Sequence, residues 1–269
     1  MDVYRSALVV LSAAGRDSTV LDDPVSHARA LVGADVQAVA TALIEPWRET
    51  GGDVMWHDDP RRPPGLAALG PAAPLLLWTR GRVPDGEYVS IVGSRNCTSY
   101  GQRVTADLAK TAAGQGRVVV SGGAHGIDAA AHTAALSVGG RTVVYLAGGA
   151  GRIYPEDHHG LFRRAAQSGA VIWEHPPSVP VRKESFLVRN RLIAATGTTT
   201  VVVEAAERSG ALNTGRTAAD LGRLVLAVPG PVGASTSAGT NRAIADGWAA
   251  ILLGPQDLNQ LLGSLPTSV

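Results

Sequence analysis

YVSIVGSR, at residues 88–95, begins as a mostly apolar run and ends in a glycine, a serine and an arginine. VVVSGGAHGID, at residues 118–128, repeats this pattern, and five more short apolar runs follow at residues 142–147, 171–173, 200–203, 224–228 and 250–253. Alanine-rich segments with helical spacing separate most of these runs, at residues 104–113, 128–136, 161–166 and 214–221. Apolar runs that alternate with helical segments predict βαβ units. We therefore expect an α/β fold with an extended Rossmann-like, doubly wound and mostly parallel sheet.

The residues before this pattern lack the alternation of apolar runs and helical segments. Residues 1–56 are predicted to be helical, with a first helix near residues 5–15 and a longer one that begins near Ser26 and ends at Pro46. Proline, glycine and arginine are frequent in the segment that follows, which indicates a linker or a strap. The expected organisation is a helical region at 1–56, a linker or strap at 57–74, a Rossmann-like domain at 75–262 and a tail at 263–269.

The composition limits the classes of function. The 269 residues include 32 glycines and only 4% aromatic residues, which suits a parallel sheet flanked by helices. The formal net charge is +1, so any contact with nucleic acid has to come from a local basic patch. The single cysteine, Cys97, excludes an intrachain disulfide, and no apolar stretch reaches the roughly 20 residues of a membrane helix. We expect a cytoplasmic protein without membrane contact.

Two loops at predicted strand ends have the chemistry of phosphate sites. In Gly93-Ser94-Arg95 the glycine allows close approach, the hydroxyl can donate to a phosphate oxygen, and the guanidinium offers two parallel donors. The loop from Ser121 and Gly122 to Asp128 opens a helix, whose free N–H groups attract anions. Neither loop has the spacing of a dinucleotide-binding or P-loop motif. A glycine that merely ends a strand remains an alternative for the first loop, as does simple helix capping by Asp128 for the second.

A basic segment surrounds an aromatic residue between positions 182 and 191. Single-stranded nucleic acid is bound by cations that contact phosphates and by rings on which bases stack, and this segment supplies both. A solvated basic face with a buried phenylalanine fits the residues equally well. The residues concerned are Arg182, Lys183, Phe186, Arg189, Asn190 and Arg191.

Two later loops also combine glycine with hydroxyl or amide side chains. Ser209 and Gly210 precede a predicted helix, and Thr240 and Asn241 follow a second glycine-rich stretch. Glu204 ends a predicted strand and suits either a catalytic base or an anchor for a nearby arginine. No nucleophile–base pair or second carboxylate accompanies it, so we expect no catalytic residues.

The histidines do not predict a metal site. His125 and His132 lie near one helix without a cysteine or an acidic cluster, which is a poor ligand set. His158 and His159 lie in a polar loop and are expected to be solvated. We therefore expect neither a metal nor a cofactor.

The ordered motifs resemble the DNA-processing protein A family, called DprA or Smf. The resemblance extends from about Pro74 to Pro255. The motifs that carry it are IVGSR at 91–95 with Tyr100-Gly101, SGGAHGIDAAAH at 121–132, IYP at 153–155, the stretch 174–177, Phe186 with RNRLIA at 189–194, VVEAAERSGALNT at 202–214, and AVPGP with SAGTN between 227 and 241. The chain departs from the family pattern at Gly151-Arg152, Leu187, Ala211, Asn213 and Gly215, which affects the expected shape of the pocket.

The resemblance implies a cytoplasmic, usually dimeric protein that binds single-stranded DNA in natural transformation and loads the RecA recombinase onto it. It also implies a phosphate-binding pocket whose residues map to Gly93, Ser94, Arg95, Lys183, Phe186, Arg189, Asn190 and Arg191, bordered by Ser121 and Gly122. The N-terminal helices resemble a short form of the sterile-alpha-motif-like region of the family. The winged-helix domain that ends many members is expected to be missing.

Two further hypotheses belong to other classes of function. A nucleotide-processing enzyme of the lysine-decarboxylase-like Rossmann group requires a glutamate after its PGGxGT stretch, whereas this chain has Pro229-Gly230-Pro231-Val232-Gly233 and no glutamate after it. A nucleotide sensor of the same fold requires an effector domain, and the sequence indicates none. A non-enzymatic DNA-binding protein is therefore the preferred hypothesis.

Overall fold

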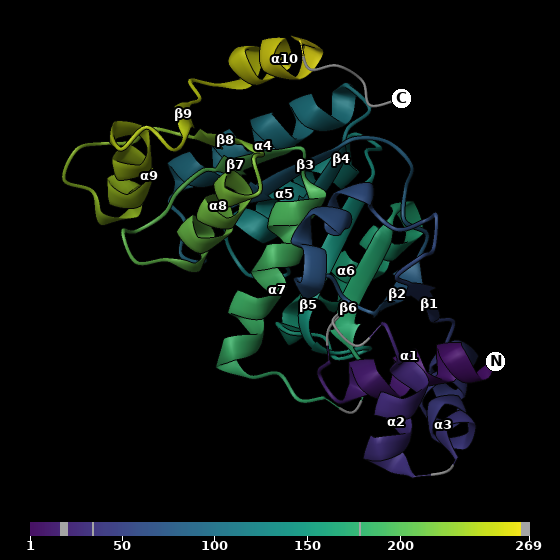
Figure 1. The fold of residues 1–269 in the computed structure, drawn as a ribbon. Helices are drawn as coiled ribbons and strands as arrows, with labels where there is room; N and C mark the ends of the chain where they lie inside the picture. Colours follow the sequence, from purple (N-terminus) through teal and green to yellow (C-terminus); the bar gives the residue numbers. More distant parts are fainter. Residues whose placement is uncertain (17–20, 34, 178, 265–269) are drawn as a thin grey trace.

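The computed structural model describes residues 1–16, 21–33, 35–177 and 179–264, and in these residues nine strands form one sheet (Figure 1). The order across the sheet is β1-β2-β6-β5-β4-β3-β7-β8-β9. The pairs β1–β2 and β2–β6 are antiparallel, and every other pair is parallel. The strands are β1 (Asp53–Trp56), β2 (Leu76–Gly81), β3 (Tyr88–Val92), β4 (Val118–Ser121), β5 (Thr142–Gly149), β6 (Ala170–His175), β7 (Thr199–Val202), β8 (Leu224–Ala227) and β9 (Ala250–Ile251). The predicted α/β fold with a mostly parallel, doubly wound sheet is confirmed.

Helices cover both faces of the sheet (Figure 1). One face packs against α4, α5 and α10, and the other packs against α7, α8 and α9. The bounds are α4 (Ser99–Gly114), α5 (Ile127–Ser137), α6 (His159–Ser168), α7 (Lys183–Thr196), α8 (Gly210–Asp220), α9 (Ser235–Ala245) and α10 (Pro255–Ser264). The described part of the predicted tail, residues 263 and 264, ends α10, and residues 265–269 lie outside the described residues. No described helix has the length and apolar composition needed to cross a bilayer.

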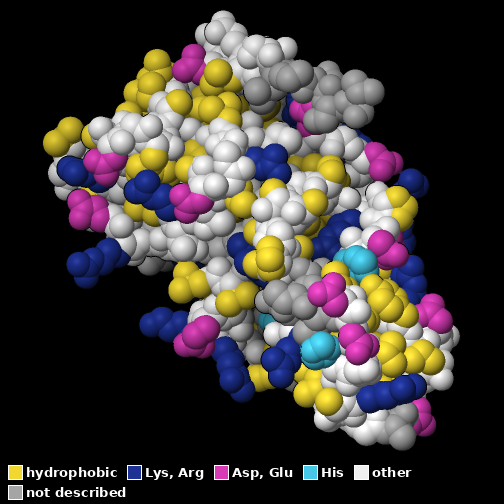
Figure 2. All heavy atoms as spheres, in the orientation of Figure 1, with side chains coloured by type: hydrophobic (Ala, Val, Ile, Leu, Met, Phe, Trp, Pro, Cys, Tyr) yellow, Lys and Arg dark blue, Asp and Glu magenta, His cyan; other side chains and the backbone are white. Residues whose placement is uncertain are grey.

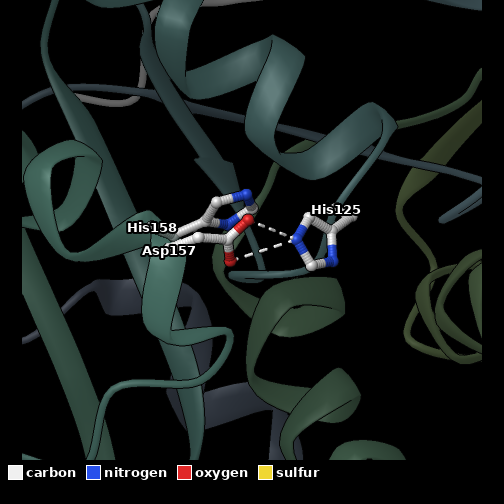
Figure 3. Close-up of side chains that lie close together, drawn as sticks. All are labelled: His125, Asp157 and His158. Carbon is white, nitrogen blue, oxygen red and sulfur yellow. Dashed lines mark hydrogen bonds and ion pairs between the residues drawn. The ribbon is translucent and has the colours of Figure 1, made fainter.

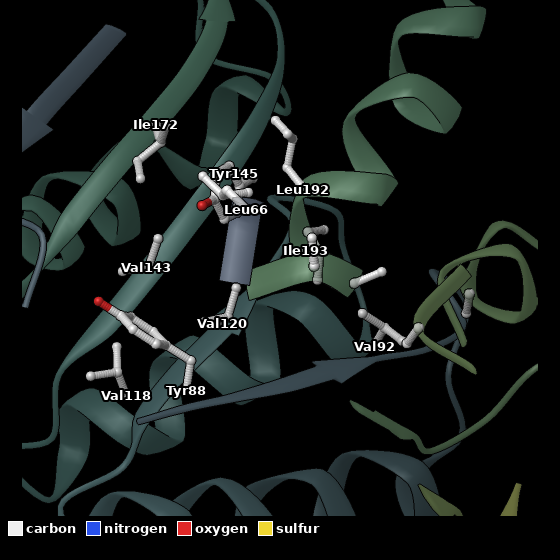
Figure 4. Packing of buried hydrophobic residues seen from close by; sticks show 14 of the residues in the cluster. Leu66, Tyr88, Val92, Val118, Val120, Val143, Tyr145, Ile172, Leu192 and Ile193 are labelled. Carbon is white, nitrogen blue, oxygen red and sulfur yellow. The ribbon is translucent and has the colours of Figure 1, made fainter. Parts of the chain in front are cut away.

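The core forms because successive side chains of a strand point to opposite faces. On β4, Val118 and Val120 pack with Ile193 of α7 in one buried cluster, whereas Val119 belongs to the cluster under α4 and α5. Figure 4 shows the first cluster from close by, which includes Tyr145 of β5 and Leu66. Strands that are buried on both faces have continuous apolar runs, and these runs made the strands recognisable in the sequence.

The N-terminal region contains three helices rather than two. They are α1 (Val3–Ala13), α2 (Pro24–Val32) and α3 (Val36–Glu49). The caps of α2 and α3 are Asp23 and Asp35, whose carboxylates accept hydrogen bonds from the backbone N–H groups of Ser26 and Ala38. The prediction of one long helix that begins near Ser26 and ends at Pro46 is therefore wrong: Ser26 lies within α2, and Pro46 lies inside α3.

Two neighbouring strands at one end of the sheet, β1 and β2, were not predicted from the sequence, and β1 is the edge strand. Asp53–Trp56, within the stretch predicted to be helical, forms β1, and β2 pairs it to the sheet. Trp47 of α3 then stacks edge-on against Trp78 of β2 and Trp173 of β6, with ring centroids 6.4 and 5.6 Å apart. These three indole rings attach the N-terminal helices to the sheet.

The segment between β1 and β2 lies against the main sheet layer. Its 3₁₀ helix η2 (Pro64–Ala72) buries Leu66 completely. Gly65 is so close to the backbone of α7 that an added Cβ would lie 2.1 Å from the carbonyl oxygen of Ala195. This part of the predicted linker or strap therefore crosses the helical face that contains α7.

Candidate nucleic-acid interface

A cleft of about 830 Å³ opens at the carboxyl ends of β3 and its neighbours. On one side of β3 the sheet continues through β4, β5 and β6, and on the other through β7, β8 and β9. This point, where the strand order reverses, is where open α/β sheets bind ligands. The predicted site residues that line the cleft are Gly93, Ser94, Arg95, Lys183, Phe186, Arg189, Asn190, Ser209 and Gly210.

The loop after β3 is fixed from two sides. The backbone N–H of Ser94 donates to the carbonyl oxygen of Glu204 at 2.7 Å, and the N–H of Ile127 donates to the Ser94 carbonyl oxygen at 3.2 Å. A Cβ at Gly93 would lie 2.5 Å from Cγ1 of Ile127. A glycine is therefore required at position 93 for packing between the two loops, and the loop is held in place before any ligand arrives.

Arg95, Phe186 and Tyr154 form a cationic and aromatic cluster at the rim of the cleft. The guanidinium carbon of Arg95 lies 4.8 Å from the centroid of the Phe186 ring. Tyr154 approaches the same ring edge-on at 5.7 Å and is about half exposed. Arg95 is exposed and forms no salt bridge with a described residue. Its donors are therefore available to an anionic ligand.

The first turn of α7 adds two more cations. Arg182 is the N-cap residue of α7, and its backbone N–H donates to Oγ of Ser185 at 3.3 Å. Lys183 is the first residue of the helix, and both basic side chains are exposed. Figure 2 shows dark blue side chains gathered around this end of α7. The rim of the cleft is therefore basic although the net charge of the chain is only +1.

Arg189 lies beneath the rim and does not extend into solvent. It is 6% exposed, and its Nη1 donates to the carbonyl oxygen of Tyr145. Burial lowers the pKa of its guanidinium to about 10, with the charge of Asp128 acting in the opposite direction. Burial also raises the pKa of the Asp128 carboxyl, opposed by the charge of Arg189. The two groups form a buried charged floor, so Arg189 is placed to support the cleft rather than to contact a phosphate on the surface.

The N-terminus of α8 closes the cleft on a further side. Oγ of Ser209 accepts a hydrogen bond from the N–H of Leu212 at 3.3 Å and so caps the helix. Nδ2 of Asn190 donates to the Gly210 carbonyl oxygen at 3.1 Å, which ties α7 to α8. The positive end of the α8 dipole therefore borders the cleft, where it favours an anion.

The remaining predicted site residues do not line the cleft. Arg191 forms a bidentate salt bridge with Glu174 of β6, in which Nη1 lies 2.9 Å from Oε2 and Nη2 donates to Oε1. Oγ of Ser121 donates to the Ile91 carbonyl oxygen at 2.6 Å, and Gly122 lies against Arg189 and Asp128. Thr240 is fully buried, and the side-chain amide of Asn241 bonds to both backbone groups of Gly230.

Glu204 holds the loop after β3. It is 2% exposed, and its carboxylate accepts hydrogen bonds from the N–H of Thr98 at 2.9 Å and from the Thr98 hydroxyl at 2.6 Å. Thr98 is the N-cap of α4. Of the two roles considered for Glu204, the anchoring role fits this geometry, although the anchored residue is a threonine and not an arginine.

Sequence reasoning missed Tyr154, Asn96 and Asp128 as lining residues. Tyr154 belongs to the IYP motif, whose position in the chain gave no sign that it would face Phe186. A periodicity along α7 was available, since Lys183, Phe186, Asn190 and Ile193 follow the three- and four-residue spacing of one helix face and all line the cleft.

Comparison with known proteins identifies the family of the chain. Residues 53–263 match the family described as DNA recombination-mediator protein A. The chain belongs to this family. A putative DNA processing protein DprA of Mycobacterium tuberculosis is 46% identical over 197 residues, which cover 72% of this chain and 50% of that relative. DNA processing protein DprA of Bacillus subtilis is 37% identical over 181 residues, 66% of this chain and 61% of that protein. The chain thus spans about half the length of the Mycobacterium tuberculosis relative.

Solved structures of family members have the same fold. The X-ray structure of DprA from Streptococcus pneumoniae superposes with a TM-score of 0.76 and 26% identity, covering 98% of this chain and 96% of that one. DNA processing protein A from Helicobacter pylori, whose structure is described by its single-stranded DNA binding mode, superposes with a TM-score of 0.72 and 28% identity, covering 80% and 97%. The resemblance inferred from the ordered motifs is confirmed.

Proposed function

We propose that the cleft binds single-stranded DNA without sequence preference. The observation that carries this proposal is the cluster of Arg95, Phe186 and Tyr154 next to Lys183. Exposed cations beside aromatic rings provide the two contacts that single strands need, and every base has a face that can stack. The buried pair of Asp128 and Arg189 and the N-terminus of α8 border the same cleft. The Helicobacter pylori relative, described as binding single-stranded DNA, supports the proposal.

The wider role that follows is a recombination mediator rather than an enzyme. We propose that the chain protects incoming single strands in the cytoplasm during natural transformation, acts as a homodimer and loads RecA. Membership of the DNA recombination-mediator protein A family supports this role. RecA filament assembly on single-stranded DNA, followed with and without the chain, tests the loading step. Sedimentation of the free chain tests the dimer.

Alanine substitution at the rim is the direct test of the cleft. We expect Arg95→Ala to weaken binding of a poly-dT oligonucleotide by about 10-fold or more, because a charge-assisted hydrogen bond contributes about 1.5–3 kcal/mol. Lys183→Ala should reduce affinity by a smaller factor, and both effects should be the same on mixed sequences. Arg82→Ala is the matched control, since Arg82 is an exposed arginine before β3, at the opposite edge of the sheet.

Normal binding by both rim variants in a fluorescence titration would exclude this cleft as the DNA site. Incubation with nucleoside monophosphates tests the enzymatic hypothesis, because release of free base would require catalysis. Calorimetry that compares binding of mononucleotides with binding of poly-dT tests the sensor hypothesis, since a sensor would bind the mononucleotide tightly.

A further inference from the structure

A cluster of two histidines and an aspartate lies beside the DNA cleft but does not line it. His125 lies in the loop between β4 and α5, and Asp157 and His158 belong to the 3₁₀ helix η3 (Glu156–His158). Nε2 of His125 lies 2.9 Å from Oδ2 and 3.1 Å from Oδ1 of Asp157. One ligand atom from each of the three residues lies within 4.8 Å of the others (Figure 3).

The backbone sets the orientation of the His158 ring. Nδ1 of His158 lies 3.0 Å from the carbonyl oxygen of Gly123. A carbonyl oxygen only accepts, so Nδ1 carries the proton and the lone pair is on Nε2. A metal-binding histidine commonly donates its second ring N–H to a carbonyl or a carboxylate in this way, which fixes both tautomer and orientation. The ring also packs edge-on against the buried Phe162, with centroids 5.7 Å apart.

His132 does not take part in this cluster. It is fully buried, its Nε2 lies 2.8 Å from the Gly122 carbonyl oxygen, and its Nδ1 lies 2.6 Å from the Thr142 hydroxyl. The sequence analysis considered His125 together with His132 because His125 lies in the loop that precedes α5 and His132 lies within that helix. The fold instead brings His125 to a loop that follows β5.

We propose that His125, Asp157 and His158 bind a divalent transition-metal ion of the Zn²⁺ class. Two imidazoles and one carboxylate suit such an ion, whereas Mg²⁺ and Ca²⁺ prefer ligands that are all oxygen. Three protein ligands leave a fourth tetrahedral position open to water. The side chains of His125 and Asp157 are 54% and 67% exposed, so an ion can enter directly from solvent.

The bound ion would join two loops that border the DNA cleft. Ala124, next to His125, lines the cleft, and so does Tyr154, three residues before Asp157. Coordination fixes the loop after β4 to the loop that carries Tyr154. The proposed metal site depends only on its three ligands. The metal proposal can therefore fail while the DNA-binding proposal holds, and the reverse is also true.

Metal titration of the full chain without an affinity tag tests the proposal. We expect calorimetry with ZnCl₂ to give one equivalent bound, and Co²⁺ to give the visible absorption of a tetrahedral site. His125→Ala, Asp157→Asn and His158→Ala should each reduce affinity by about 10-fold or more, because even the loss of a partner that only orients a metal ligand typically costs about 10–100-fold. His159→Ala is the matched control, because it removes the neighbouring histidine and should bind the ion as the wild type does.

Two results would overturn the site. One is a wild-type chain that binds no Zn²⁺ at micromolar concentrations. The other is a triple variant, with His125, Asp157 and His158 all replaced, that still binds one equivalent with unchanged affinity. Thermal unfolding of each metal-free variant shows whether it is folded, and poly-dT binding by the metal-free wild type reports on the DNA cleft alone.

Discussion

At the scale of single residues, Gly122 controls the charged floor of the cleft. A Cβ at this position would lie 2.2 Å from Nη1 of Arg189 and 2.5 Å from Oδ2 of Asp128. Both partners are buried and hydrogen-bonded, Arg189 to the Tyr145 carbonyl oxygen and Asp128 to the N–H of Ala124, so a shift of either side chain has a cost. We therefore expect Gly122→Ala to lower the free energy of unfolding by about 2 kcal/mol, the usual range for overpacking a buried site, and to weaken DNA binding. Urea denaturation and an oligonucleotide titration measure the two effects.

Gly114→Ala is the control for this substitution. Gly114 is the last residue of α4, and an added Cβ there would meet nothing within 4 Å. Stability should stay the same or rise by up to about 1 kcal/mol, because alanine is the better helix former. Equal stability losses in the two variants would show that the close approach at Gly122 carries no strain.

The contacts of Arg189 and Arg191 could not be predicted from the sequence. Both lie in one basic segment, and the sequence assigned both to phosphate. On a helix, residues two positions apart point in different directions. Arg189 is therefore buried over Asp128, while Arg191 reaches Glu174 on β6. The composition of the segment was sufficient to locate the cleft, but burial of each side chain depends on the packing of α7.

At the scale of elements, α5 is coupled to the sheet through His132, which bridges the end of β4 and the start of β5. Burial lowers the pKa of His132 from 6.5 to about 4. The unfolded chain therefore takes up this proton at a higher pH than the folded chain does. The contribution of His132 to the free energy of unfolding is present in full above pH 6.5. It is lost as the pH decreases toward 4, and the loss is roughly 3 kcal/mol.

Urea unfolding between pH 4 and pH 8 measures this dependence. We expect His132→Gln to show a smaller loss of stability across the window, because glutamine can donate to Gly122 but does not titrate. His57, whose pKa is also lowered by burial, contributes equally in both proteins. An identical pH dependence in wild type and variant would rule out His132 as the titrating group.

Elements differed in how well the sequence defined them. The central strand β3 was predicted with its observed bounds, because burial on both faces gives a continuous apolar run. The edge strand β1 has only four residues and depends on β2 for its hydrogen bonds, so its local pattern is weak. The break between α2 and α3 follows from Gly33, which ends α2 at a positive φ of 80°, and from Asp35, which caps the start of α3; both were present in the sequence but were not used.

At the scale of the whole molecule, charge is nearly balanced, so the strength of the proposed DNA binding has to come from the rim of the cleft. Arg95, Arg182 and Lys183 are the exposed cations that line it. For single strands, the logarithm of the binding constant falls with the logarithm of salt concentration at about 0.7 per neutralised phosphate. Three phosphate contacts predict a slope of about −2.

A salt titration with short poly-dT oligonucleotides checks this slope. Arg95→Ala should reduce its magnitude by about 0.7, while Arg82→Ala should leave it unchanged. A groove beside the cleft, lined by Arg208, Arg216 and Arg242, offers further cations. However, Arg216 stacks on Trp248 at 4.4 Å and Arg242 pairs with Asp246 at 3.0 Å, so we expect little contribution from them. A slope near −4 would contradict binding by the rim alone, because it would require the strand to continue along that groove.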